Sequence, residues 1–369
     1  MVSVAVSFFV MILATTVSSG YRKEIRGGIS SFSGDVTLSP AGWNALEETG
    51  SISDHPSFLD ALEQLDGVRS ITPVVTRAGI VKQGELIHGV IFKGVGGEEM
   101  ESLHARVPSK LARMLRVADG DRLLAYFVGE RVQARNFEVS EIYENPLSIE
   151  DALIIYVPVG DLQRLNGWAE DRVSGLEVRL SERFQSPRQM EYKASELGAI
   201  AAARVRDDDD VLIARSIVES YPQLFDWLGL IDYNVVIILI LMSIVAGFNM
   251  ISGLLILLFR SMSTIGVLKS MGMTDRGIAG VFLRVAAGVV LKGLAIGNVL
   301  ALLFCLVQGK THFLKLDPEN YFIGFVPTAV DLPMVLLADL AAFGVIMLLL
   351  LIPTLFIARI DPAQTVRAQ

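Results

Sequence analysis

Hydrophobic residues in this chain are gathered into four long runs, one at the start of the sequence and three in its last third. Residues 1–19 and 235–259 hold no charged residue, residues 285–308 hold only Lys292, and residues 332–358 hold only Asp339. A helix needs about 20 apolar residues to cross the hydrocarbon core of a bilayer. The pattern therefore predicts a membrane protein with four transmembrane α-helices, at residues 1–19 and about 232–259, 278–308 and 332–358.

The polar stretch between the first and second runs, residues 20–225, has the pattern of a large α+β domain. Residues 70–82 and 85–93 are rich in β-branched side chains on either side of Gln83-Gly84, which predicts a hairpin. Further strands are expected at 122–128, 136–143, 152–158 and 174–181. Helices are expected at 107–117, at 160–166, after Ser186-Pro187, and from the run Asp207–Asp210 onward into the second span.

Composition narrows the possible functions. The net charge is -8, whereas a nucleic-acid-binding protein needs a basic stripe, so nucleic acid is not an expected partner. The only cysteine is Cys305, so no disulfide can form within the chain. The four histidines lack the spacing of a metal site, so no metal is expected. Gly309-Lys310-Thr311 lacks the upstream glycine of a phosphate loop, so we expect no nucleotide site and no enzymatic activity in this chain.

Charges in the loops give an expected orientation. The loop 260–276 contains Arg260, Lys269 and Arg276, and the positive-inside rule places such a loop in the cytosol. The domain at 20–225 then lies outside, although the basic residues just after the first span favour the opposite arrangement. No basic region precedes the first run, so we expect a retained span rather than a cleaved signal peptide.

The loop between the second and third spans carries a regular apolar stripe. On a helix covering 261–276, apolar side chains recur every three residues, at Met262, Ile265, Leu268 and Met271. So short a helix is not stable alone in water. Its stripe is predicted to dock into a groove on a partner protein, and the alternative of a helix lying on lipid is equally open.

Residues 249–283 resemble the second span, coupling helix and third span of FtsX-type ABC transporter permeases. The matching core is Ile265-Gly266-Val267-Leu268-Lys269 followed by Met271-Gly272-Met273. Within that superfamily the chain is most similar to lipoprotein-releasing permeases of the LolC and LolE kind. The segments that support this are GYRKEI at 20–25, LNGW at 165–168, LDPENY at 316–321 and RIDP at 359–362.

The sequence departs from the family pattern in two places. The family usually has an acidic residue where Thr264 stands. Its members also usually begin further upstream, so the first span at 1–19 is expected to lack its cytosolic lead-in.

The resemblance implies an organisation and a set of partners. Residues 20–225 would be a MacB-like periplasmic core, and 226–369 an FtsX-like permease domain in the bacterial inner membrane. The partners would be a cytosolic LolD-like ABC ATPase that binds ATP and Mg, a second permease subunit of the same or a homologous chain, a periplasmic LolA-like carrier, lipoprotein substrates and membrane lipid. This chain would bind no cofactor. The expected ATPase-coupling residues are Met262, Thr264, Ile265, Gly266, Leu268, Lys269, Met271 and Gly272.

Residues within the spans suggest two further roles. A broad apolar lining suited to acyl chains is expected from Phe8, Phe9, Ile12, Phe248, Met250 and Ile251. Close helix packing is expected at Gly288, Gly293 and Gly297. Lys292 and Asp339 lie at different depths, so no ion pair between them is expected. Pro353 should kink the fourth span.

The expected function is that of a permease subunit that couples ATP hydrolysis by a separate ATPase to the extraction of lipoproteins from the outer leaflet of the inner membrane. Transfer to a periplasmic carrier would follow. The alternatives are a mechanotransmitting efflux permease like the macrolide exporters, an FtsX-like protein that signals to a cell-wall hydrolase, and an antimicrobial-peptide sensor.

Overall fold

The computed structural model describes residues 1–42, 50–96, 100–129, 131–144, 153–206 and 209–354. The predictions for Asp207, Asp208 and the closing segment 359–362 lie outside these residues. The chain divides into two compact units. We call residues 1–23, 226–316 and 325–354 the membrane bundle, and residues 24–225 with 317–324 the β-rich domain.

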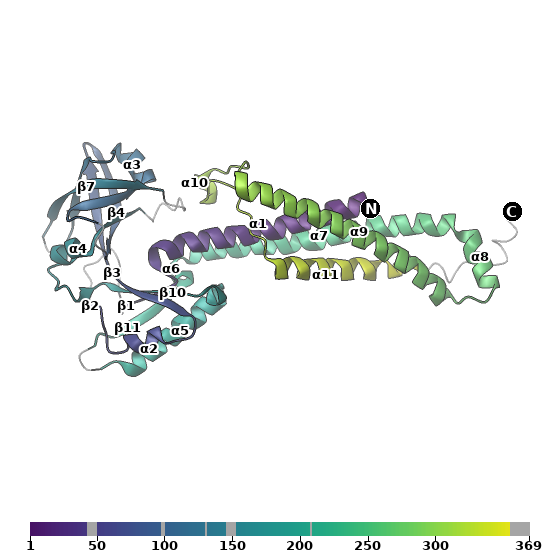
Figure 1. The fold of residues 1–369 in the computed structure, drawn as a ribbon, viewed down its shortest axis with the longest axis horizontal. Helices are drawn as coiled ribbons and strands as arrows, with labels where there is room; N and C mark the ends of the chain where they lie inside the picture. The colour runs from purple at the N-terminus through teal and green to yellow at the C-terminus, as the bar shows by residue number, and fades with distance from the viewer. Residues whose placement is uncertain (43–49, 97–99, 130, 145–152, 207–208, 355–369) are drawn as a thin grey trace. The chain divides into compact units, whose positions relative to one another are not determined.

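Four helices of the described chain are long and apolar enough to cross a membrane, which confirms the predicted arrangement of one N-terminal and three C-terminal spans. They are α1 (Val2–Ser33), α7 (Pro222–Arg260), α9 (Asp275–Thr311) and α11 (Leu332–Leu349), which continues into α12 (Leu351–Thr354). In the bundle these helices run side by side (Figure 1). Their shared core contains Phe8 and Met11 of α1, Ala246 of α7, Val290 of α9 and Ile346 of α11.

Two helix boundaries differ from the sequence-based expectation. Helix α1 continues to Ser33 rather than ending near residue 19. Helix α7 begins at Pro222, so the helix expected from the aspartate run does not form there. Residues 212–216 form strand β11 instead, followed by the short helix α6 (Ile217–Ser220), which starts with a capping box between Ser216 and Glu219.

The fourth span is interrupted at Leu350. Proline has no backbone N–H, so Pro353 cannot donate to the carbonyl of Leu349 four residues earlier. The interruption at Leu350 is therefore the local effect expected from Pro353.

The β-rich domain is built on a sheet in the order β11-β1-β10-β3-β4-β8-β5-β7-β6, and β3 also pairs with β6. That last pairing closes six strands, from β3 to β6, into a barrel. The strands are β1 (Val36–Pro40), β3 (Val68–Gln83), β4 (Leu86–Val95), β5 (His104–Pro108), β6 (Arg122–Phe127), β7 (Gln133–Tyr143), β8 (Ile154–Pro158), β10 (Gly175–Leu180) and β11 (Leu212–Ser216). A separate pair joins β2 (Ile52–Ser53) to β9 (Arg172–Val173).

Strand β3 belongs to both parts of the sheet because it is 16 residues long. Its first half pairs with β10, and its second half pairs with β4 and β6. The barrel core contains Phe92, Phe127 and Phe137, with the Phe92 centroid 4.8 Å from that of Phe127 and 5.4 Å from that of Phe137. The predicted hairpin is present, and Gly84 has the positive φ of +59° that its tight turn requires.

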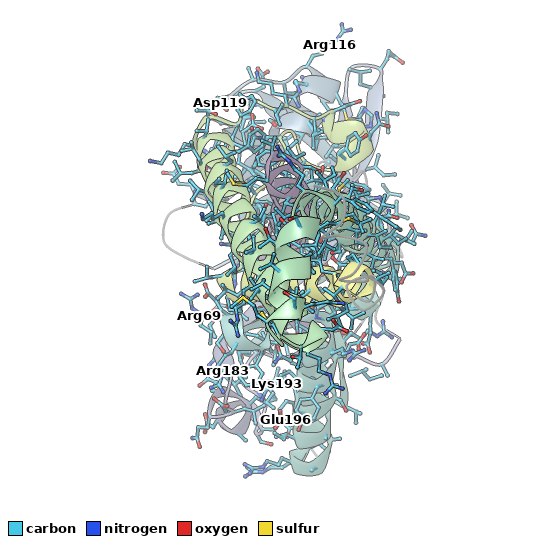
Figure 2. All side chains as sticks on the ribbon, turned by 90° about the vertical axis from the view of Figure 1, so that its right-hand side faces the viewer. Arg69, Arg116, Asp119, Arg183, Lys193 and Glu196 are labelled. Atoms are coloured by element: carbon cyan, nitrogen blue, oxygen red, sulfur yellow. The ribbon has the colours of Figure 1, made fainter. Side chains whose placement is uncertain are left out.

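Further helical segments complete the described part of the domain. They are α2 (Leu59–Glu63), α3 (Ser109–Leu115), α4 (Val159–Asn166), the 3-10 turn Glu182–Phe184 and α5 (Pro187–Arg204), while α10 (Pro318–Tyr321) comes from the later part of the chain. Helix α3 begins two residues later than predicted because Val107 and Pro108 end strand β5. On α5, Lys193 pairs with Glu196 at 2.8 Å and lies 4.6 Å from the Phe184 ring centroid, which Arg183 also approaches (Figure 2).

Candidate functional site

The loop between the second and third spans forms a short helix, α8 (Met262–Ser270). The turn that follows it contains Gly272, whose φ of +91° favours glycine. Helix α9 begins at Asp275, where the Thr274 side chain accepts a hydrogen bond from the N–H of Gly277. The predicted helix over 261–276 is therefore two elements joined by a sharp turn, and the expected coupling residues Met271 and Gly272 lie in that turn.

The apolar stripe on α8 docks onto this chain itself. Ile265 is 1% exposed and lies in the bundle core with Leu258 of α7 and Ile278 of α9. Leu268 is half-buried against the same core, and the Gly266 backbone is buried. The expectation that Ile265 and Leu268 enter a groove on a partner is wrong, because the ends of α7 and α9 already provide that groove.

Lys269 is also held within the chain. Its ammonium lies 2.8 Å from the carboxylate of Asp275 at the start of α9, and its side chain is mostly buried. A carboxylate is favourable at that position because the N-terminus of a helix carries partial positive charge. Lys269 therefore fixes α8 to α9 rather than presenting its charge to another protein.

A different face of α8 is exposed. Thr264 and Val267 are three residues apart, which places them on one side of α8, and Met271 follows at the start of the turn. Val267 is 49% exposed and Met271 79% exposed. We call these three residues the α8 outer face. The sequence pattern did not identify Val267, because the predicted stripe began at Met262 and continued every three residues, which leaves out position 267. The side chain of Met262 is half-buried.

The residues expected to line an acyl-chain cavity fall into three groups. Phe8, Ile12 and Met250 are buried in the packed cores of the bundle, so they line no cavity in this chain. Phe9 and Ile251 are half-buried. Phe248 is 62% exposed on the surface of α7. The prediction grouped them wrongly because apolar composition does not separate core residues from surface residues in a membrane helix.

The bundle does have an apolar groove, between the first part of α1 and the second half of α9. Its volume is about 540 Å³, and its lining includes Val2 and Phe9 from α1 and Leu300, Phe304 and Val307 from α9. Phe9 is the one predicted acyl-chain residue among those that line it. The rings of Phe9 and Phe304 make an edge contact with their centroids 6.2 Å apart.

Two of the three predicted packing glycines lie at the contact between α9 and α1. A Cβ added to Gly297 would lie 2.6 Å from the Ala5 carbonyl oxygen, and one added to Gly293 would lie 2.8 Å from Val4 Cγ1. A Cβ added to Gly288 would meet no atom within 4 Å, so Gly288 is not part of this contact. The absence of side chains at Gly293 and Gly297 thus lets α9 approach α1 closely at this contact.

Lys292 and Asp339 have different environments. Lys292 is exposed and makes no ion pair within the described chain. Asp339 is 6% exposed, and its Oδ2 accepts a hydrogen bond of 2.5 Å from Nδ2 of Asn298 on α9. Asn298 was not considered in the sequence because it is uncharged, although it lies on the predicted third span.

The β-rich domain contains a separate cavity of about 780 Å³, next to the last turn of α1. On its wall, the Lys93 ammonium lies 2.7 Å from the Glu177 carboxylate and donates a 2.5 Å hydrogen bond to the Phe32 carbonyl. Burial lowers the pKa of Lys93 and raises the pKa of Glu177, and the attraction between the two charges opposes both shifts. Lys93 therefore joins three elements, the end of α1, strand β4 and strand β10.

Comparison with known proteins places this geometry in context. Residues 236–362 match the family model of the FtsX-like permease C-terminal domain. Over 99% of its length the chain is 24% identical to the lipoprotein-releasing system transmembrane protein LolC of Xylella fastidiosa (strain Temecula1), covering 92% of that protein. It is 21% identical to LolE of Haemophilus influenzae over 98% of the chain and 92% of that protein. It is 23% identical to LolC of Neisseria meningitidis serogroup B over 99% of the chain and 92% of that protein.

Two solved structures are similar to about half of the chain. The extracellular domain of the noncanonical ABC-type transporter YknZ from Gram-positive bacteria is 12% identical, with a TM-score of 0.31, covering 49% of this chain and 99% of that one. The periplasmic region of MacB from Actinobacillus actinomycetemcomitans is 12% identical, with a TM-score of 0.31, covering 52% of this chain and 92% of that one.

Proposed function

We propose that this chain, which carries an FtsX-like permease C-terminal domain, is the permease subunit of an ABC transporter that releases lipoproteins from the outer leaflet of a bacterial inner membrane. The observation that carries the proposal is the similarity to LolC and LolE, the lipoprotein-releasing transmembrane proteins, over 98–99% of the chain. That similarity includes the β-rich domain as well as the four spans. A periplasmic lipoprotein carrier of the LolA kind would receive the released substrate.

A separate cytosolic ATPase of the LolD kind, which binds ATP and Mg, would supply the energy. We place its contact on the α8 outer face, with Val267 and Met271 as the apolar anchors and Thr264 beside them. Exposed apolar side chains grouped on one short helix fit the helix-in-groove mode of recognition. The resemblance to FtsX-type permeases implies an acidic residue at the position of Thr264, so this contact would lack one charge.

The attachment of α8 supports a mechanical role. Ile265 and Leu268 pack against α7 and α9, and the Lys269–Asp275 ion pair adds a polar link at 2.8 Å. Packed interiors transmit displacement because they are as dense as organic crystals. A push on Val267 and Met271 would therefore reach both neighbouring spans without first bending α8 away from them.

The orientation follows from the same segment. Arg260, Lys269 and Arg276 give the α8 segment a basic character, which favours the cytosolic side. The β-rich domain, separated from this segment by one span, then lies in the periplasm.

A second permease subunit would complete the path for the lipid. Phe248 and its neighbours Ile240, Leu241 and Ile244 form an exposed apolar surface on α7. With Phe9 and Ile251 half-buried beside the bundle core, acyl chains would lie against these surfaces between two permease chains.

The test is reconstitution of the full chain with its ATPase, its pairing permease and a lipidated substrate in proteoliposomes. We expect ATP-dependent transfer of the lipoprotein to a soluble carrier. A catalytically dead ATPase and a substrate without acyl chains are the matched controls. Failure of transfer by an intact, ATP-hydrolysing complex would refute lipoprotein release.

A further inference from the structure

Asp339 lies inside the membrane bundle, on the buried stripe of α11 formed with Val335, Ala342 and Ile346. It is eight residues beyond Asp331, the N-cap of α11, which places it about 12 Å along the helix from that end. The hydrocarbon core is about 30 Å thick, so this depth is well within it. An ionised carboxylate at that depth needs a cation or strong hydrogen bonds to be stable.

No cation lies beside Asp339 in the described chain. Helix α11 has no other charged residue, and the stretch of α7 between Asp232 and Arg260 has none. On α9 the nearest charge is Lys292, which is exposed, six residues from Asn298 and about 9 Å further along the helix. The first charge of α1 is Arg22, which pairs with Asp232 at 3.4 Å.

The hydrogen bonds around Asp339 are incomplete in a specific way. Asn298 donates one N–H to Asp339 Oδ2. The second oxygen of Asp339 and the carboxamide oxygen of Asn298 are both buried, and neither has a hydrogen-bond partner. Both are acceptors, and buried acceptors without a donor are rare in native proteins.

One proton supplies what both oxygens lack. A protonated Asp339 has an O–H on Oδ1, which can donate to the carboxamide oxygen of Asn298. Together with the existing N–H bond this gives the two-point acid–amide pair, in which each group donates once and accepts once. A metal ion would need more ligands than these two oxygens, since even the smaller magnesium ion takes six.

We propose that Asp339 holds a proton within the membrane and that the neutral Asp339–Asn298 pair fastens α11 to α9. The paired groups carry no net charge, so hydrocarbon around them does not oppose the contact. Asp339, with its bound proton, is thus a positioning residue for the fourth span.

Infrared spectroscopy of the full chain in lipid bilayers tests the proton directly. We expect the spectrum of Asp339→Asn to lack one C=O band of a protonated carboxyl, with the carboxylate bands unchanged. Asp232→Asn is the matched control, because Asp232 pairs with Arg22 and should lose a carboxylate band instead. Loss of a carboxylate band in Asp339→Asn would overturn the proposal.

Rescue by an isosteric amide tests the pairing. Asparagine at 339 can still donate one N–H and accept one, so Asp339→Asn should keep a thermal midpoint near that of the parent chain, whereas Asp339→Leu and Asn298→Leu should each lower it. The exchanged variant Asn298→Asp/Asp339→Asn should regain a protonated-carboxyl band. If Asp339→Asn is as unstable as Asp339→Leu, or if the exchanged variant shows only carboxylate bands, the acid–amide pair is refuted.

Discussion

Replacing Gly297 by alanine should weaken the contact between α9 and α1. The new Cβ would lie 2.6 Å from the Ala5 carbonyl oxygen, 2.8 Å from Phe8 Cβ and 3.1 Å from the Phe9 nitrogen. Ordinary contact begins at 3.4 Å, so α1 must move by about 0.8 Å. The nearest atom belongs to the backbone of α1, so a side-chain rotation cannot relieve the clash.

The size of the effect follows from the general cost of overpacking, about 1–3 kcal/mol. Alanine has a helix propensity up to about 1 kcal/mol better than glycine, which offsets part of that loss. Gly288→Ala gains the propensity without any clash, so it is the matched control in the same helix. Gly293→Ala should fall between the two, because its closest atom, at 2.8 Å, is the tip of the Val4 side chain.

The assay is the thermal unfolding midpoint of the full chain in lipid nanodiscs. We expect the order Gly297→Ala lowest, then Gly293→Ala, then Gly288→Ala at or above the parent chain. Equal midpoints for Gly297→Ala and Gly288→Ala would refute the close approach of α9 to α1.

Three further predictions concern α8 and the buried ion pair. Val267→Asp and Met271→Asp should each weaken ATPase binding by about tenfold or more, measured by co-purification and titration, with the thermal midpoint unchanged, since each places a charge on an exposed apolar anchor. Ile265→Ala should instead lower the free energy of unfolding by about 2–5 kcal/mol, and unchanged stability would contradict its burial. Lys93→Met should destabilise the protein by about 3–5 kcal/mol at pH 8, because it leaves Glu177 buried without its cation. The pKa of Glu177 is raised by burial, so the folded state binds its proton more tightly than the unfolded state, and the stability of Lys93→Met should fall further as the pH rises from 5 to 8. Urea unfolding at both pH values checks the sign, and Lys93→Met/Glu177→Gln should remove the pH dependence.

Much of the architecture could be predicted because it depends on local patterns. Runs of about 20 apolar residues identified the four spans, and Gly84 between two β-branched runs identified the β3–β4 hairpin. The closure of the barrel through pairing of β3 with β6 could not be predicted, because it joins residues more than 40 positions apart without any turn signal. Strand β11 was missed for a related reason: it pairs only with β1, near the start of the domain.

The candidate site was predicted less well because sequence periodicity identifies an apolar face but not the surface that covers it. Ile265 and Leu268 were correctly recognised as one stripe, yet they are covered by this chain rather than by a partner. For the charged residues, the difference in depth along their helices indicated that Lys292 and Asp339 do not form an ion pair. It did not identify Asn298, because a neutral side chain gives no charge signal in a transmembrane sequence.

The contacts within the bundle make α9 the element through which displacement of α8 would spread. At its start, Asp275 holds Lys269 of α8. Farther along, Gly293 and Gly297 lie against α1, and Asn298 binds Asp339 of α11. Helix α9 contacts three other elements through backbone or polar groups, and such contacts do not slide as freely as contacts between apolar side chains. We therefore expect Asp275→Ala to uncouple ATP hydrolysis from substrate release while ATPase binding persists. Release at the parent rate by Asp275→Ala would place the coupling in α7 instead.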